Sequence, residues 1–186
     1  MTISSRMVGA LALVTAAALP APAAAEVAAA AGGGFATSHS AVVPASRWQV
    51  WEELLHPENW WTHTWSNDPM NLRLDARAGG CFCERVPVEG SWEAGEVEHG
   101  RVVALFPEQM LRLNGSLGPL QAEGVTGTLT VTLSEAGQGN TRIQWDYVVG
   151  GATRSEMTAM SSAVDKVQGE FLGSFASFIR QGTADR

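Results

Sequence analysis

The stretch 155–181 constrains the fold more than any other part of the chain. Its apolar residues recur at steps of three and four, which places them on one face of a helix. Charged residues such as Asp165 and Lys166 occupy the opposite face, and Gly182 is predicted to end the helix. At 1.5 Å per residue the helix would be about 40 Å long, so it needs a broad surface to pack on. The apolar positions are Met157, Met160, Val164, Val167, Phe171, Phe175 and Phe178.

The first 25 residues are predicted to be a secretory signal peptide. Arg6 precedes an apolar run at 7–19, and small residues at 23–25 form an A-x-A-like cleavage site. The run is shorter than the roughly 20 residues that cross a bilayer. The alternative is an uncleaved N-terminal anchor, against which the small residues argue. We therefore expect a periplasmic or secreted protein whose residues 26–34 form a flexible Ala/Gly tail.

The charge balance argues against two classes of partner. The formal net charge is -7, Lys166 is the single lysine, and loss of Arg6 with the leader would make the mature chain more negative. Nucleic acids and anionic lipid surfaces both favour clustered Lys and Arg, so neither is expected as a partner. After the leader no stretch is long and apolar enough for stable membrane insertion. The oligomeric state is left open.

Alternating apolar and polar residues predict antiparallel strands. The pattern is clearest at 125–133 and 143–149, which flank a hairpin turn at 137–140. Ser46 is the expected cap of a short helix at 47–55, with Trp48, Trp51 and Leu54 on its buried side. A second short helix is expected at 58–61 and a loop at 62–71. Further strands are expected at 35–43, 72–76, 81–86, 97–105 and 109–114.

These elements predict an α+β domain at 35–182. A curved antiparallel sheet of about seven strands should carry two short helices after its first strand and the long C-terminal helix over its concave face. Cys81 and Cys83 are expected to be two small buried thiols, because residues two apart on an extended strand hold their Cβ atoms too far apart for a bridge. A bulge-assisted disulfide is the alternative.

Several segments together resemble a known superfamily. They are Pro44 with residues 47–51 and 54, His56-Pro57-Glu58-Asn59-Trp60-Trp61, residues 74–80, residues 98–102 and the closing helix. Over 35–181 the chain resembles the START/Bet v-like (SRPBCC, helix-grip) superfamily of polyketide cyclase/dehydrase-like proteins, in an exported bacterial version of the branch named for a chaperone ATPase activator.

The resemblance implies a cavity between sheet and helix that binds a hydrophobic or aromatic small molecule, with no cofactor. The branch name is not carried over as an activity, because a chaperone activator needs a cytosolic, ATP-using partner and the leader predicts export.

Most of the candidate ligand-binding residues come from three places in the chain. The aromatic cluster at 60–65 would stack on a ring or, alternatively, pack the short helix on the sheet. His99 and Arg101, two apart on one strand, would share a face and bind a carboxylate or phenolate with Glu84, or else face solvent. The last strand and the long helix would supply the remaining wall. The full set is Trp60, Trp61, His63, Trp65, Glu84, His99, Arg101, Leu113, Trp145, Tyr147, Met160 and Val164.

Three functions remain open at this point. The first is small-molecule binding without catalysis. The second is a cyclase, dehydratase or hydrolase using His99, Arg101, Glu84 or Asp146. The third is a protein-interaction module that uses the loop at 62–71 as an apolar surface. No metal site is expected, because the C-x-C pair lacks the second paired motif of a structural zinc site.

Overall fold

The fold consists of one antiparallel sheet and one long helix. The computed structural model describes residues 26–30, 33–154 and 156–184. Eight strands follow one another in the order β1-β2-β8-β7-β6-β5-β4-β3. They are β1 (Glu26–Ala30), β2 (Gly34–Val43), β3 (Leu72–Leu74), β4 (Cys81–Pro87), β5 (Ala94–Phe106), β6 (Met110–Asn114), β7 (Gly124–Glu135) and β8 (Thr141–Ala152).

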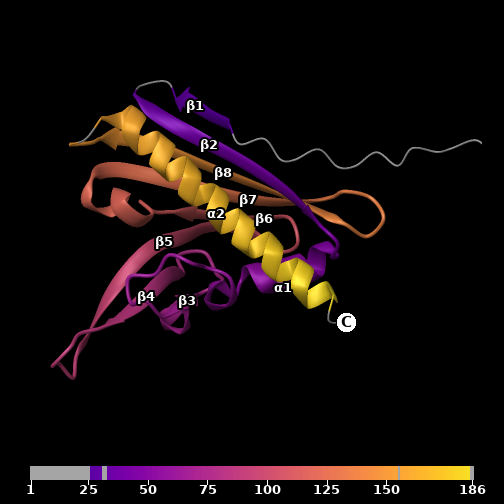
Figure 1. Cartoon of the computed structure of the whole chain (residues 1–186), viewed down its shortest axis with the longest axis horizontal. Helices are drawn as coiled ribbons and strands as arrows, with labels where there is room; N and C mark the ends of the chain where they lie inside the picture. The colour runs from indigo at the N-terminus through magenta and orange to yellow at the C-terminus, as the bar shows by residue number, and fades with distance from the viewer. Residues whose placement is uncertain (1–25, 31–32, 155, 185–186) are drawn as a thin grey trace, which may run out of the picture.

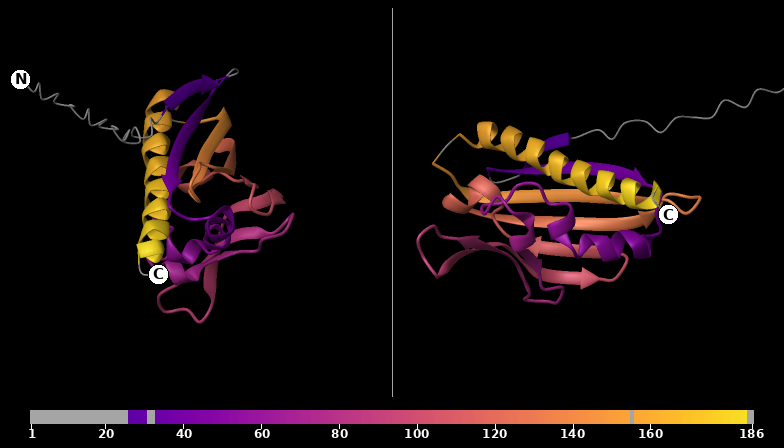
Figure 2. Two further views of the ribbon diagram at one scale, coloured as in Figure 1. Left: turned by 90° about the vertical axis from the view of Figure 1, so that its right-hand side faces the viewer. Right: turned by 60° about the horizontal axis from the view of Figure 1, so that its bottom comes forward.

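Two α-helices and three short 3₁₀ turns complete the described chain. Helix α1 spans Arg47–Leu54 and α2 spans Met157–Ala184, while the 3₁₀ turns lie at Pro57–Asn59, Pro69–Asn71 and Gly118–Ala122. Helix α2 runs diagonally across the sheet (Figure 1). The sheet curves toward the side on which α2 and α1 lie (Figure 2). This is the predicted α+β helix-grip architecture, and the core fills the space between sheet and helices.

The alternating strands pack as expected. In β7 and β8 the inward series includes Val131 and Trp145, which are register partners and are almost fully buried. Within α2 the side chains of Val164, Phe171 and Phe175 are buried, as the stripe predicted. Gly182 does not end the helix, which continues to Ala184. Glycine costs a helix only about 1 kcal/mol relative to alanine, so it need not stop one.

Two further expectations about local structure are corrected. Residues 26–30, expected in a flexible tail, form β1, and their backbones pair antiparallel with β2. Ladder hydrogen bonds join backbone groups and so place little demand on side chains. Trp48, expected on the buried side of α1, is 57% exposed, because Val50, Trp51 and Leu54 define the buried face. The predicted cap is confirmed: Ser46 and Gln49 form a capping box.

The predicted signal peptide, residues 1–25, lies outside the described residues. Within the described chain, none of the helices is long and apolar enough to cross a membrane.

The β4–β5 pairing is irregular near Cys81 and Cys83, which were expected to be free thiols. Phe82 pairs with Gly100 but Cys83 pairs with Glu98, so His99 is an extra residue on β5, a β-bulge. The Cα atoms of Cys81 and Cys83 are 5.4 Å apart, shorter than the roughly 6.6 Å between alternate residues of an extended strand. The two cysteines form a disulfide. The structure therefore has the bridge that was the alternative to free thiols, on the strand that faces the bulge.

Candidate functional site

The candidate site is a partly enclosed cavity between α2, the segment after α1 and the loop between β6 and β7. Its volume is about 120 Å³. Rim residues His63, Trp65 and Pro119 are exposed, so the cavity opens to solvent. The lining residues are Trp61, His63, Trp65, His99, Leu117, Gly118, Pro119, Ala163, Val164, Val167, Gln168 and Phe171.

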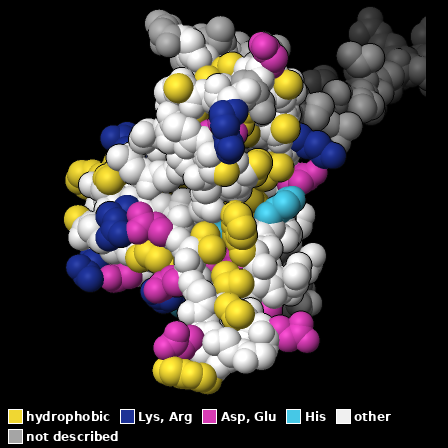
Figure 3. Space-filling view, turned by 90° about the vertical axis from the view of Figure 1, so that its left-hand side faces the viewer, with side chains coloured by type: hydrophobic (Ala, Val, Ile, Leu, Met, Phe, Trp, Pro, Cys, Tyr) yellow, Lys and Arg dark blue, Asp and Glu magenta, His cyan; other side chains and the backbone are white. Residues whose placement is uncertain are grey.

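A surface view shows apolar side chains near a histidine. The face of the molecule that lies at the left of Figure 1 carries a run of hydrophobic side chains beside a histidine (Figure 3). In the segment between α1 and β3, Trp65 and Met70 are largely exposed. At the rim of the cavity the exposed ring of Trp65 lies with His63, which faces the carboxylate of Glu170.

A buried histidine–carboxylate pair supports one part of the cavity wall. His99 Nε2 lies 2.8 Å from Glu84 Oε2, and the side chains are 2% and 0% exposed. The β-bulge turns His99 inward, while Arg101 points outward, donates to the Gly79 carbonyl and pairs with Glu98. The expectation that His99 and Arg101 share a face is therefore wrong, because one extra residue on a strand reverses the alternation after it.

The charge states of this pair follow from burial and hydrogen bonding. Burial acts to raise the pKa of the Glu84 carboxyl, but hydrogen bonds from Ser66, the Trp65 backbone and His99 outweigh it, and the pKa lies below its usual value. Burial lowers the pKa of His99, against the opposing effect of Glu84. At neutral pH Glu84 is therefore a carboxylate and His99 a neutral imidazole. Because a carboxylate only accepts, His99 carries its proton on Nε2.

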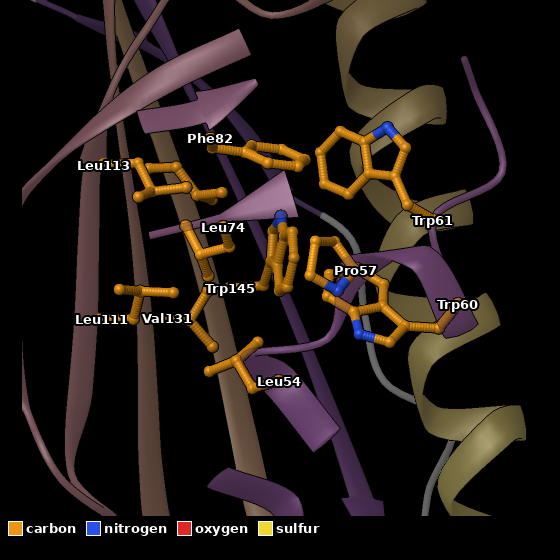
Figure 4. A pocket seen from close by; sticks show the side chains of 11 residues that line it. Leu54, Pro57, Trp60, Trp61, Leu74, Phe82, Leu111, Leu113, Val131 and Trp145 are labelled. Atoms are coloured by element: carbon orange, nitrogen blue, oxygen red, sulfur yellow. The ribbon is translucent and has the colours of Figure 1, made fainter. Parts of the chain in front are cut away.

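Trp61 separates this cavity from a second, smaller void. Its ring stacks on Phe171 at 3.7 Å between centroids, and its indole N–H donates to the His63 carbonyl. On its other side Trp61 meets Phe82 edge to face at 4.9 Å. Behind it lies a void of only about 20 Å³ between the sheet and the segment after α1 (Figure 4). That volume is about one water-sized probe.

The inner void is lined by several residues that were predicted from the sequence to contact the ligand. Trp60, Leu113 and Trp145 line it together with other apolar side chains that point toward one another (Figure 4). Trp60 packs against Trp145 at 6.1 Å and Phe175 at 4.7 Å between centroids. These three residues therefore lie in the core beneath the cavity, separated from it by Trp61.

Tyr147 positions one wall of the cavity without lining it. Its hydroxyl donates to the Gly115 carbonyl and accepts from the Leu117 backbone N–H, at 2.8 and 3.0 Å. Burial raises the pKa of Tyr147 to about 12, so the phenol stays protonated. Gly127 makes room for it, since a Cβ there would lie 2.1 Å from the tyrosine oxygen. The loop that carries Leu117 is thus anchored to β8.

Gln168 is the buried polar wall residue that sequence reasoning missed. It is 1% exposed on α2, and its Oε1 accepts from Trp145 Nε1 at 2.7 Å. The signal was available, because position 168 continues the apolar stripe four residues after Val164 and three before Phe171. A glutamine on such a stripe is a buried polar group that needs a partner.

The remaining predicted residues are distributed as follows. Five of them line the cavity: Trp61, His63, Trp65, His99 and Val164. Glu84 accepts the hydrogen bond from His99 Nε2 on the side away from the cavity. Met160 is only partly buried and is not among the lining residues. Asp146, weighed as an acid or base, bonds to Ser38 and Gln144 away from the inward series of β8. Only His99 and Glu84 of the proposed polar set therefore converge.

One group of potential metal ligands lies away from the cavity. The sulfur atoms of Cys81 and Cys83 and a carboxylate oxygen of Glu98 are within 4.8 Å of one another. The sulfurs are joined in the disulfide, and a metal binds the thiolate form. This group does not fit a metal while the bridge is intact.

Comparison with known proteins identifies the fold. The sequence matches no protein-family model and no curated protein. Mll3558 from Rhizobium loti is 15% identical, with a TM-score of 0.57 over 77% of this chain and 95% of that one. SA2116 from Staphylococcus aureus is 14% identical, with a TM-score of 0.57 over 81% and 98%. CalU16 from Micromonospora echinospora is 16% identical, with a TM-score of 0.51 over 85% and 83%. At these identities the likeness concerns the fold alone.

Proposed function

We propose that this chain is an exported START/Bet v-like protein that binds one small hydrophobic or aromatic molecule in the cavity beside α2. The observation that carries the proposal is the cavity itself. Aromatic rings from Trp61, Trp65 and Phe171 contribute to a mostly apolar wall with an open rim. Ligand pockets are typically concave and apolar with a few placed polar groups.

The volume limits the size of the ligand. Pockets for drug-sized molecules measure about 300–1,000 Å³, whereas an apolar cavity of about 150 Å³ binds a benzene ring. At about 120 Å³ the cavity matches a single substituted ring, with its substituents directed to the rim. The cavity is compact, and Met160, one of the predicted ligand-binding residues, is not among its lining residues.

The test is binding of single-ring compounds by the purified protein. Toluene, phenol and benzaldehyde should each be screened by thermal shift and titration calorimetry. A ligand at 100 times its dissociation constant stabilises the native state by about 2.7 kcal/mol. Ala163→Phe, which adds a ring at the cavity wall, should abolish the shift. Gly173→Ala, which adds a methyl group to open space on the same helix, should preserve it. Absence of any shift would contradict the proposal and favour the interaction-module hypothesis.

Export is part of the proposal. It is supported by the leader-like residues 1–25 and by the Cys81–Cys83 disulfide, since disulfides persist mainly in oxidising compartments. Expression in a bacterial host followed by fractionation and N-terminal sequencing should give a periplasmic or secreted chain that begins near Glu26. A full-length chain retained in the cytoplasm would contradict export.

A second candidate, catalysis, is favoured by one specific observation. A neutral histidine whose Nε2–H is held by a carboxylate is the arrangement that prepares a general base. Incubation of each binding compound with the protein, followed by mass spectrometry, separates the candidates. A compound recovered unchanged supports binding alone. A compound converted by the native protein but not by the His99→Ala variant supports an enzyme.

A further inference from the structure

Two polar atoms that belong to buried side chains at the cavity wall have no protein partner among the described residues. Gln168 and His99 both line the cavity and are almost fully buried. Each uses one polar atom in a bond to the protein. Among the hydrogen bonds of the described residues, Gln168 Nε2 and His99 Nδ1 take part in none. Polar groups of buried side chains nearly always have a partner, so unpaired ones at a cavity wall are available to water or to a polar ligand.

The orientation of the Gln168 amide is fixed by Trp145. An indole N–H can only donate, so the atom that it meets at 2.7 Å must be the amide oxygen. The NH₂ group of Gln168 therefore has no protein partner in the described part of the chain, and it offers two N–H donors. Trp145 is itself locked in the core, so Gln168 is held as a fixed donor.

The orientation of the His99 proton is fixed by Glu84. The carboxylate accepts from Nε2 and also from the backbone N–H groups of Trp65 and Ser66. With its proton on Nε2, neutral His99 presents an acceptor lone pair at Nδ1. The cavity wall therefore combines one fixed acceptor with one fixed donor.

We propose that the ligand is a neutral single-ring molecule with a hydroxyl group that donates to His99 Nδ1 and a carbonyl group that accepts from Gln168 Nε2. This inference rests on the proposed binding function and specifies the ligand class. Charge favours the neutral form: Glu84 lies directly behind His99, and Arg101 points away. His63 at the rim already faces the Glu170 carboxylate at 3.3 Å. A carboxylate ligand would find no arginine or lysine in the cavity lining.

The experiment compares ligands that differ only in polar groups. Calorimetric affinities should be measured for toluene, phenol, benzaldehyde and the three hydroxybenzaldehyde isomers. Each buried hydrogen bond should improve the affinity by roughly three- to tenfold. Phenol and benzaldehyde should therefore each bind more tightly than toluene, and one hydroxybenzaldehyde isomer should bind most tightly of all. The isomer that binds most tightly shows how far apart Gln168 Nε2 and His99 Nδ1 lie in solution.

Two variants test the two assignments separately. Gln168→Met removes the donor and should abolish the advantage of benzaldehyde over toluene while preserving that of phenol. His99→Phe keeps a ring in place and should do the reverse. Toluene binding controls for folding in both variants, because a collapsed cavity would lose toluene as well. If His99→Phe fails to fold, phenol binding measured above and below the pKa of His99 in the native protein replaces it, with tighter binding expected at the higher pH.

The outcomes distinguish this inference from the function on which it rests. Equal affinities for toluene and all hydroxybenzaldehydes would overturn the inference and leave the binding function intact. Absence of binding by every compound would overturn both. Equal loss of all ligands in both variants would overturn the assigned roles of Gln168 and His99, because such residues would support the cavity without recognising polar groups.

Discussion

His99 Nε2 and Glu84 Oε2 lie 2.8 Å apart, and both side chains are almost fully buried. Glu84 also binds the backbone of Trp65 and Ser66, so one carboxylate joins β4, β5 and the segment that forms the cavity rim. The ring of His99 lies 5.0 Å from that of Phe82. The pair thus couples the shape of the cavity to the sheet beneath it.

Removal of the carboxylate should destabilise the protein. Glu84→Ala leaves the Nε2–H of His99 and two backbone N–H groups without their acceptor. We expect a loss of about 3 kcal/mol in the free energy of unfolding, measured by urea denaturation. Glu96→Ala, which removes an exposed carboxylate on β5 that pairs with Arg73 of β3, should cost less than about 1 kcal/mol. Equal losses in both variants would contradict a special role for Glu84.

Stability should fall on acidification in two steps. The folded-state pKa of His99 lies below its usual 6.5. Below pH 6.5 the unfolded chain therefore binds a proton that the native protein binds less readily, and stability is lost as pH falls through the folded value. The pKa of Glu84 is also lowered from its usual 4.5, so its contribution is lost below that pH. Urea denaturation at pH 7, 6, 5 and 4 measures both steps.

A matched variant identifies the first step. His99→Phe should flatten the pH dependence just below pH 6.5. His56→Gln, at an exposed histidine, should leave that dependence in place. A native protein with constant stability between pH 7 and pH 5 would contradict the assignment of a neutral buried His99.

Two tryptophans of opposite burial should differ in their importance for stability. Trp145 is 1% exposed and Trp92 is 90% exposed. Trp145→Ala should cost about 3–5 kcal/mol, because it creates a cavity in the core. It also removes the bond to Gln168. Trp92→Ala should change the free energy of unfolding by no more than about 0.5 kcal/mol. Thermal and urea unfolding of the two variants provide the measurement.

Trp61 should limit the size of the ligand. It lines both the cavity and the inner void, so Trp61→Ala should join them into one larger space. We expect the variant to bind naphthalene, which the native protein should exclude. Trp60→Ala enlarges the inner void behind an intact Trp61 and should not bind naphthalene. Calorimetric binding of naphthalene by the native protein would show that the cavity already extends past Trp61.

The Cys81–Cys83 disulfide should contribute modestly to stability. A bridge that closes a three-residue loop is worth about 1–2 kcal/mol in the chain-entropy model. The double variant Cys81→Ala/Cys83→Ala should lose this amount in urea denaturation and become insensitive to reductant. A native protein whose stability is equal with and without reductant would show that the bridge is absent in solution or contributes nothing.

Repeating local patterns were read correctly from the sequence. The alternation in β7 and β8, the stripe on α2 and the cap at Ser46 depend on neighbours within a few residues, so they predict their elements directly. The helix-grip arrangement followed, because a long one-sided helix and a curved antiparallel sheet can bury their apolar faces only against each other.

The site was predicted only in part, for an identifiable physical reason. His99 and Glu84 were named, but their partnership depends on a bulge that turns one side chain inward and Arg101 outward. One extra residue in a strand has no strong local signature, because it is selected by the register of both strands. Cys81 and Cys83 were expected as free thiols from ideal strand geometry, but their Cα atoms lie 5.4 Å apart, within reach of a bridge.

The sequence by itself determined the element types, the antiparallel sheet and the helix that covers it, since these follow from side-chain periodicity. Only the tertiary structure decided which aromatic residues fill the core, which line the cavity, and that Gln168 and His99 each keep one polar atom unpaired there. Those properties depend on volumes and contacts between residues far apart in the chain, such as Trp145 and Gln168, and periodicity carries no information about them.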